Sequence, residues 1–157
     1  MVAVVLVFLL SMLGAFVDAG YIELFKDASF KNKLIRIENV LTDVCYNFVC
    51  DKLDNTITSA KWKGLPETGS LFAGGEAVIS FITDKSCSGG EVRRFAINTQ
   101  SKSSPKFPAN FKSDGIGNAI SSFKVWNTGF DGGLLNICPS SESAFVLNTT
   151  IVQQTNV

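Results

Sequence analysis

Two short segments of the chain bring together side chains that could coordinate a cation. Residues 54–59 read Asp-Asn-Thr-Ile-Thr-Ser, and residues 117–122 read Gly-Asn-Ala-Ile-Ser-Ser. Carboxylate, amide, hydroxyl and carbonyl oxygens are the hard ligands that Ca²⁺ prefers in proteins. The same residues are also typical of Asx and Ser/Thr turns that bind no ion. These two hexapeptides are therefore interpreted either as a cation site or as ordinary turns that lead into strands.

Other site chemistry is restricted by the composition. The chain contains no histidine, which excludes Ser–His–Asp, Cys–His and His-based zinc sites. No pair of carboxylates has a context that indicates a raised pKa, so an enzyme is not expected. The 14 basic residues balance the 14 acidic ones. Nucleic acid and anionic membranes attract concentrated basic surfaces, so neither is expected as a partner.

The N-terminal segment is typical of a secretory signal. Residues 1–19 are almost wholly apolar and end with small residues at the two positions that signal peptidase recognises, Val17 and Ala19. An uncleaved membrane anchor is the alternative, but Ser11 and Gly14 interrupt a run that is short for a span. We therefore expect a secreted, extracellular protein that has no transmembrane segment after cleavage.

The four cysteines are predicted to form disulfides, because an even number in a secreted chain favours pairing over thiol chemistry. Three pairings of Cys45, Cys50, Cys87 and Cys138 are possible. The short spacing of the first two suits a local bridge, which would leave Cys87 to pair with Cys138.

The elements that would position these residues are predicted to be short strands. Apolar and polar residues alternate over 21–25, 34–37, 59–62 and 92–97, and no segment has a sustained helical period. The two halves of the chain repeat one another. Each contains a hairpin before its hexapeptide, with matching positions at Phe25, Phe30 and Asn32 and at Ile82, Cys87 and Gly89. Such a duplication predicts two Greek-key motifs packed as a sandwich.

These motifs resemble the βγ-crystallin family. Residues 22–32 are similar to the folded hairpin that opens its Greek key: an aromatic, four residues, a second aromatic, any residue and Gly. Residues 54–59 fit its calcium signature: Asn/Asp, Asn/Asp, two free positions, Ser/Thr and Ser. Asn32 replaces the Gly, and Cys87 replaces the second aromatic of the later hairpin.

The resemblance covers Tyr21 to about Trp126. It implies an all-β, βγ-crystallin-like sandwich of two Greek-key motifs over residues 20–126, with motif one at about 21–63 and motif two at about 77–126. Residues 127–157 would form a C-terminal extension packed on this domain. Short strands are predicted within the extension at 134–138 and 145–147.

The resemblance also implies two calcium sites between the motifs, with ligands from both halves. Hydroxyl oxygens would come from Thr58 and Ser121, backbone carbonyls from Thr56 and Ala119, and side-chain oxygens from Asp54, Asn55 and Asn118. Gly117 lacks the oxygen of the first signature position, so one site is expected to be crippled. Few carboxylates imply weak binding, at about 10⁻⁴–10⁻³ M or somewhat tighter. Vestigial loops that hold no ion are the alternative.

The expected function is a secreted non-catalytic module with a structural or binding role. Its partners would be the calcium ion and an unknown extracellular protein or glycan. A secreted toxin, elicitor or enzyme inhibitor on the same scaffold is the alternative, and residues 101–108 are the candidate loop for it. The sequon at Asn148 predicts a glycosylated surface position.

Overall fold

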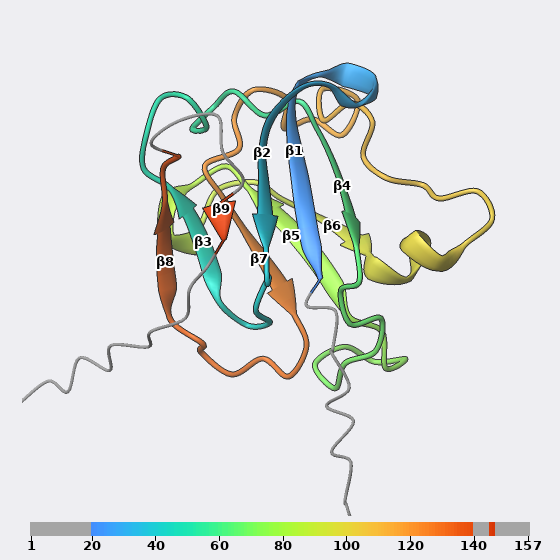
Figure 1. Ribbon diagram of the computed structural model, residues 1–157. Helices are drawn as coiled ribbons and strands as arrows, with labels where there is room; N and C mark the ends of the chain where they lie inside the picture. Colours follow the sequence, from blue (N-terminus) through green and yellow to red (C-terminus); the bar gives the residue numbers. More distant parts are fainter. Residues whose placement is uncertain (1–19, 140–144, 147–157) are drawn as a thin grey trace, which may run out of the picture.

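The computed structural model describes residues 20–139 and 145–146 and contains two β-sheets (Figure 1). Sheet A has four strands in the order β4-β1-β2-β9, and sheet B has five in the order β6-β5-β7-β3-β8. The strands are β1 (Tyr21–Asp27), β2 (Lys31–Glu38), β3 (Cys45–Phe48), β4 (Ser59–Lys63), β5 (Val78–Ile82), β6 (Val92–Ala96), β7 (Ser122–Trp126), β8 (Leu134–Ile137) and β9 (Phe145–Val146). Three 3₁₀ turns lie between them: η1 (Ala28–Phe30), η2 (Lys85–Cys87) and η3 (Ile97–Ser101).

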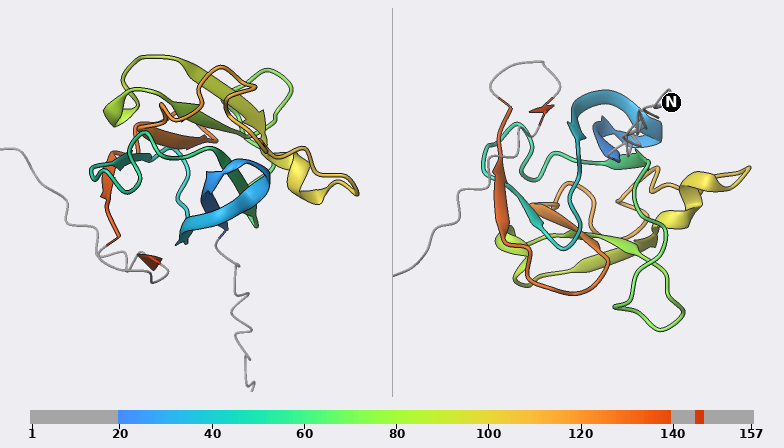
Figure 2. Two further views of the ribbon diagram at one scale, coloured as in Figure 1. Left: turned by 90° about the horizontal axis from the view of Figure 1, so that it is seen from above. Right: turned by 60° about the horizontal axis from the view of Figure 1, so that its bottom comes forward.

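The two sheets pack face to face, as Figure 2 shows, and bury apolar side chains of β1, β2, β3, β4, β5, β7 and β8 between them. On β1, Ile22 and Leu24 are buried in the core, whereas Glu23 lies on the outer side among lysine and arginine side chains. On β4, Ala60 and Trp62 face the core together, as their spacing predicted. The period-2 pattern of the sequence therefore produces an all-β sandwich.

Each sheet takes part of its structure from both halves of the chain. Strands β1 to β4 form the first Greek key. Three of them lie in sheet A, whereas the third, β3, lies in sheet B and pairs antiparallel with β7. The equivalent segment of the second motif is irregular but makes the reciprocal contact with β4. There the Ala60 N–H donates to Pro108 O at 3.1 Å, and the Phe111 N–H donates to Thr58 O at 2.8 Å. The second Greek key therefore has an irregular third segment.

Both hairpins are folded over and are held by the last serine of their own hexapeptide. Ser59 Oγ donates to Asp27 O at 2.6 Å and accepts the Phe30 N–H at 3.1 Å. Ser122 Oγ makes the equivalent bonds to Asp84 O at 2.6 Å and from the Cys87 N–H at 3.3 Å. The duplication seen in the sequence is thus also a duplication of hydrogen bonds.

The left-handed positions of the hairpins agree only in part with the expected match. Asn32 has φ of +51°, as the resemblance implied. In the second hairpin Gly89 is not left-handed, and Gly90 adopts φ of +67° instead. The turn is shifted by one residue because Glu91 bonds back to Thr83 through both its N–H and its carbonyl.

Strands β8 and β9 lie at sheet edges. Four residue pairs join β8 to β3 in parallel, and β9 pairs in parallel with the end of β2. The predicted signal segment, 1–19, and the sequon at Asn148 lie outside the described residues. Within the described ranges, no helix has the length and hydropathy needed to cross a membrane.

The expected disulfide pairing is wrong. Cys45 pairs with Cys87 and Cys50 pairs with Cys138, at Cα–Cα distances of 6.0 and 5.5 Å. A strand rises by about 3.3 Å per residue, so the extended segment from Cys45 to Phe48 already spans about 10 Å and cannot close a local bridge. Cys45 of β3 is instead joined to the 3₁₀ turn η2, and Cys50, just after β3, is joined to the segment after β8.

Candidate calcium site between the two hexapeptides

The two hexapeptide turns lie against each other although they are about 60 residues apart. In each turn the second residue is left-handed, with φ of +59° at Asn55 and +55° at Asn118. The Asn55 N–H donates to Ile120 O at 3.0 Å, which joins the two turns through the backbone. Asn tolerates this conformation better than other residues with a Cβ, so the Asn at this position of both copies has a geometric reason.

Two pairs of oxygen-bearing side chains meet between the motifs. Thr58 Oγ1 donates to Asn118 Oδ1 at 2.8 Å, and Ser121 Oγ donates to Asp54 Oδ1 at 2.5 Å. Both hydroxyl residues are buried. We call these pairs the Thr58 half-site and the Asp54 half-site. The structure thus brings together four of the seven residues that the resemblance nominated as calcium ligands.

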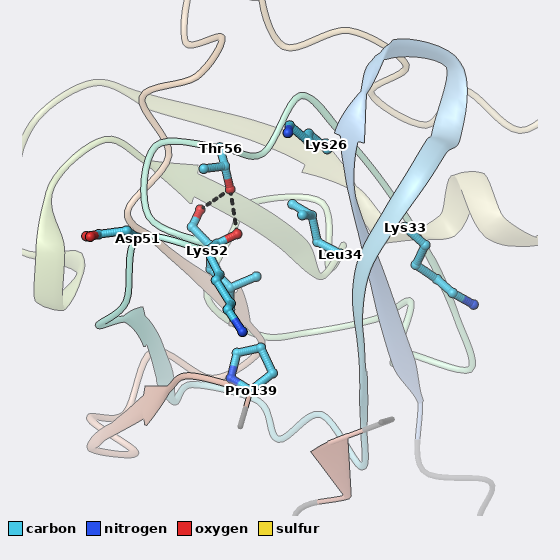
Figure 3. Close-up of a pocket in the computed structure, with 8 residues that line it drawn as sticks. Lys26, Lys33, Leu34, Asp51, Lys52, Thr56 and Pro139 are labelled. Carbon is cyan, nitrogen blue, oxygen red and sulfur yellow. Dashed lines mark hydrogen bonds between the residues drawn. The ribbon is translucent and has the colours of Figure 1, made fainter. Parts of the chain in front are cut away.

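The two backbone carbonyls nominated as ligands are also open. Within the described part of the chain, neither Thr56 O nor Ala119 O accepts a hydrogen bond. The Thr56 hydroxyl turns back to the carbonyls of Lys52 and Leu53 at 2.9 Å, as the dashed lines in Figure 3 show. This residue therefore stabilises its own turn with its side chain and leaves its carbonyl available.

The Asp54 half-site carries a protein cation of its own. Lys85 Nζ lies 3.1 Å from Asp54 Oδ2. Lys85 follows Asp84 in the second hairpin, and the matching residue of the first hairpin is Ala28. The Asp54 carboxylate is therefore already partly neutralised by the ammonium.

The Thr58 half-site lacks a carboxylate because Gly117 stands where the first copy has Asp54. A Cβ at Gly117 would lie 2.7 Å from Lys112 Cα and 2.8 Å from Lys112 N. The backbone of residues 111–117 approaches itself too closely for a side chain at this position. Gly117 is thus required by packing, and its loss of an oxygen ligand is a consequence.

The surface around the Thr58 half-site is open and basic. Lys26 and Lys112 line the hollow beside Thr58 and Asn118 together with Asp27. Over residues 20–139 and 145–146, no cluster of three or more Asp, Glu or Cys side chains could hold a metal ion. A cation bound here would depend on neutral oxygens, which favours weak binding.

A neighbouring hollow lies between β2 and the first hexapeptide turn (Figure 3). Leu34 and Leu53 form its apolar lining, and three lysines stand around it. Their side chains point in different directions, and Lys33 is paired with Glu23 at 3.1 Å. No group of polar side chains converges on this hollow.

Sequence reasoning missed Lys85 and Lys112, which modify the two half-sites in different ways. The position of Lys85 could have been found by aligning the hairpins, because it follows an aspartate in the repeated segment. The contact of Lys112 with Gly117 has no signal in the sequence, since it depends on how the loop closes.

No known protein-family profile and no curated protein sequence matches the chain. Among solved structures it is similar to the N-terminal domain of protein S, at 15% identity and a TM-score of 0.42, over 68% of this chain and 96% of that one. It is also similar to a βγ-crystallin from Ciona intestinalis, at 21% identity and a TM-score of 0.37, over 67% and 98%. A βγ-crystallin domain from Clostridium beijerinckii follows at 12% identity and a TM-score of 0.39, over 67% and 95%. The family that the hairpin and hexapeptide motifs resemble is thus also named among the solved structures to which the chain is similar.

Proposed function

We propose that the chain is a secreted, non-catalytic module with a structural or binding role, and that it binds calcium weakly between its two hexapeptides. The observation that carries the calcium proposal is the meeting of oxygen side chains across the motifs. Thr58 Oγ1 and Asn118 Oδ1 lie 2.8 Å apart, although the two residues belong to different turns. The open carbonyls of Thr56 and Ala119 support the same assignment.

Charge sets the expected affinity. The two half-sites contain one carboxylate, and Lys85 competes for it. A divalent cation would displace either the Thr58–Asn118 hydrogen bond or the Lys85 ion pair, and both displacements reduce the net gain. We expect a dissociation constant of about 10⁻⁴–10⁻³ M, the range of extracellular calcium modules.

Calorimetric titration with calcium tests this proposal on the oxidised protein. Thr58→Ala is expected to remove binding at one half-site, and Ser121→Ala at the other. Ser103→Ala is the matched control, because Ser103 is an exposed hydroxyl outside both hexapeptides. Calcium should also raise the melting temperature, since an ion that binds only the folded state stabilises it. Identical melting curves in excess calcium and in chelator would contradict the calcium proposal.

A second candidate function, a secreted toxin, elicitor or inhibitor, is favoured by one projecting segment. All of residues 101–106 are exposed to solvent. They form the yellow-to-orange loop that projects from the sandwich in Figure 2. Two contacts hold the base of this loop in place. Gln100 Nε2 donates to Leu65 O at 2.7 Å, and the Phe107 ring packs edge-on against Trp62, with the ring centroids 4.9 Å apart. A rigid base with a protruding tip suits insertion into a partner.

Cell-lysis and growth-arrest assays distinguish this second candidate. If it is correct, replacing residues 102–106 by Gly and Ser abolishes the effect while the melting temperature is retained. The calcium variants Thr58→Ala and Ser121→Ala should leave the effect unchanged. An inert wild-type protein in both assays would rule out the lytic and growth-arresting forms of this candidate.

A further inference from the structure

A cavity of about 400 Å³ lies on the outer face of sheet B, away from the hexapeptide half-sites. Phe123 and Val125 of β7 face the core, so the alternate residues of that strand face outward. The cavity is lined by Lys124 and Trp126 of β7, the Cys45–Cys87 disulfide, Asp131 and Leu134. This volume is sufficient for a small ligand.

Lys124 is the unusual group in this cavity. Its exposed fraction is only 7%, yet it forms no salt bridge and no side-chain hydrogen bond within the described residues. Its ammonium lies 4.3 Å from the centroid of the Trp126 ring. A cation–π contact at this distance holds the ammonium over the ring. The stem of this lysine is therefore buried, while its ammonium remains open to the cavity and has no salt-bridge partner within the described residues.

The remaining lining supplies two other kinds of contact. Trp126 is half-buried and is held by a hydrogen bond from Nε1 to Ser80 Oγ at 2.9 Å, which fixes the indole. Leu134 adds apolar surface. Asp131 places an acceptor at the exposed rim and is itself oriented by the Gly133 N–H at 3.0 Å.

The rim is pre-organised by a buried carboxylate behind it. Asp43 accepts the N–H groups of Asn127, Thr128 and Gly129 and the Thr128 hydroxyl, at 2.7–3.0 Å. These bonds fix the loop that leads from β7 to Asp131. A rigid rim lowers the ordering cost of binding.

We propose that this cavity binds an acidic saccharide, with the sugar carboxylate on Lys124, a hydroxyl on Asp131 and the ring against Trp126. A carboxylate is the partner that the Lys124 ammonium lacks within the described residues. An uncharged sugar would leave Lys124 unpaired, and an apolar carboxylate would offer no hydroxyl to the second carboxylate oxygen of Asp131. A zwitterionic amino acid could satisfy both charges, so it is a separate arm of the test.

Nuclear magnetic resonance of the ¹⁵N-labelled, oxidised protein tests the proposal with a control inside the molecule. The two tryptophans give two indole N–H signals: Trp126 bonds Ser80 at the cavity, and buried Trp62 bonds Ile97 O at 3.2 Å. Glucuronate and N-acetylneuraminate are titrated to about 10 mM, a range that detects weak single-site binding. We expect a saturable shift of the Trp126 signal, no shift of the Trp62 signal and no response to neutral glucose.

Lys124→Met keeps the aliphatic stem and removes the charge. It is expected to weaken glucuronate binding at least tenfold and to change the melting temperature little, because the buried stem is kept and the ammonium makes no salt bridge within the described residues. Lys63→Met, on an exposed lysine of sheet A, is the matched control and should bind like the wild type.

Four results would overturn the proposal: no saturable shift with either acid, an equal response to glucose, equal binding by Lys124→Met, or a lower melting temperature of that variant. Alanine is titrated in parallel as the zwitterionic amino acid. A response to alanine alone would instead assign the cavity to a zwitterion and would also reject the saccharide. Calcium titration monitors different residues, so this test and that of the calcium sites can fail independently.

Discussion

The Lys85 ammonium lies 3.1 Å from Asp54 Oδ2 and thus occupies the one carboxylate that the two hexapeptides contain. A lysine in this position opposes the binding of any cation at the Asp54 half-site. Lys85→Met should therefore raise calcium affinity there by about 3- to 10-fold, the effect of removing one nearby partly exposed charge. Calorimetry measures this change. Lys52→Met, an exposed lysine in the same turn as Asp54, is the control, and an equal gain in both variants would mean that only net charge matters.

Gly117 should not accept the aspartate that would complete the second signature. Its Cβ would lie 2.7–2.8 Å from backbone atoms of Lys112, which cannot move as the end of a flexible side chain can. We expect Gly117→Ala and Gly117→Asp to lower the free energy of unfolding by about 1–3 kcal/mol, the usual cost of overpacking. Urea denaturation measures this loss. If the aspartate variant is as stable as the wild type and gains calcium affinity, packing does not explain the glycine.

Asp43 should make the fold sensitive to acid. Burial opposes its ionisation, but the hydrogen bonds from Asn127, Thr128 and Gly129 outweigh burial and lower its pKa. Because the folded pKa lies below the unfolded value of about 3.9, this stabilisation is present above about pH 4 and is lost as the pH falls further. Asp43→Asn should lower the free energy of unfolding at pH 7 by about 1–3 kcal/mol and flatten the acid limb of its pH dependence.

Thermal unfolding between pH 2 and pH 7 measures the effect of this substitution. The exposed Asp51→Asn is the control and should follow the wild-type curve. A wild-type acid limb that survives in Asp43→Asn would locate the acid sensitivity elsewhere. Glu23 would be the next group to test, because Lys33 and Lys61 outweigh its burial and lower its pKa.

Ser59 and Ser122 should contribute similarly to stability, because each joins the two ends of its hairpin turn. Replacing either by Ala leaves a partly buried N–H without its acceptor, and we expect a loss of about 1–3 kcal/mol in each case. Chemical denaturation measures both, and the exposed Ser103→Ala should change stability by less than about 0.5 kcal/mol. Reduction of the disulfides should increase the cost of Ser122→Ala alone, since Cys45–Cys87 tethers only the second hairpin. A neutral Ser59→Ala would contradict the role of these serines.

The strands and the first hairpin could be predicted because their signals are local. Alternation along β1 separates Ile22 and Leu24 from Glu23, and this pattern depends only on neighbouring residues. The left-handed conformation of Asn32 likewise follows from what its side chain tolerates. The second hairpin was less predictable, because bonds between Thr83 and Glu91 moved its left-handed residue to Gly90.

The disulfides could not be predicted because they depend on the position of β3, which lies in sheet B while the other strands of its motif lie in sheet A. Spacing alone favoured a bridge between Cys45 and Cys50, but a strand keeps its ends apart. Once β3 lies in sheet B, Cys45 comes next to the second hairpin and Cys50 next to the end of β8.

By itself, the sequence determined which residues could meet. It contained the repeated oxygen-rich turns and the period-2 strands that bring them to one end of a sandwich. Only the tertiary structure decided what each group meets: Thr58 meets Asn118, Asp54 meets Lys85 as well as Ser121, and Lys124 meets no anion. The reason is that local patterns depend on neighbours in sequence, whereas charge pairing depends on groups that only the packed chain brings within a few ångströms.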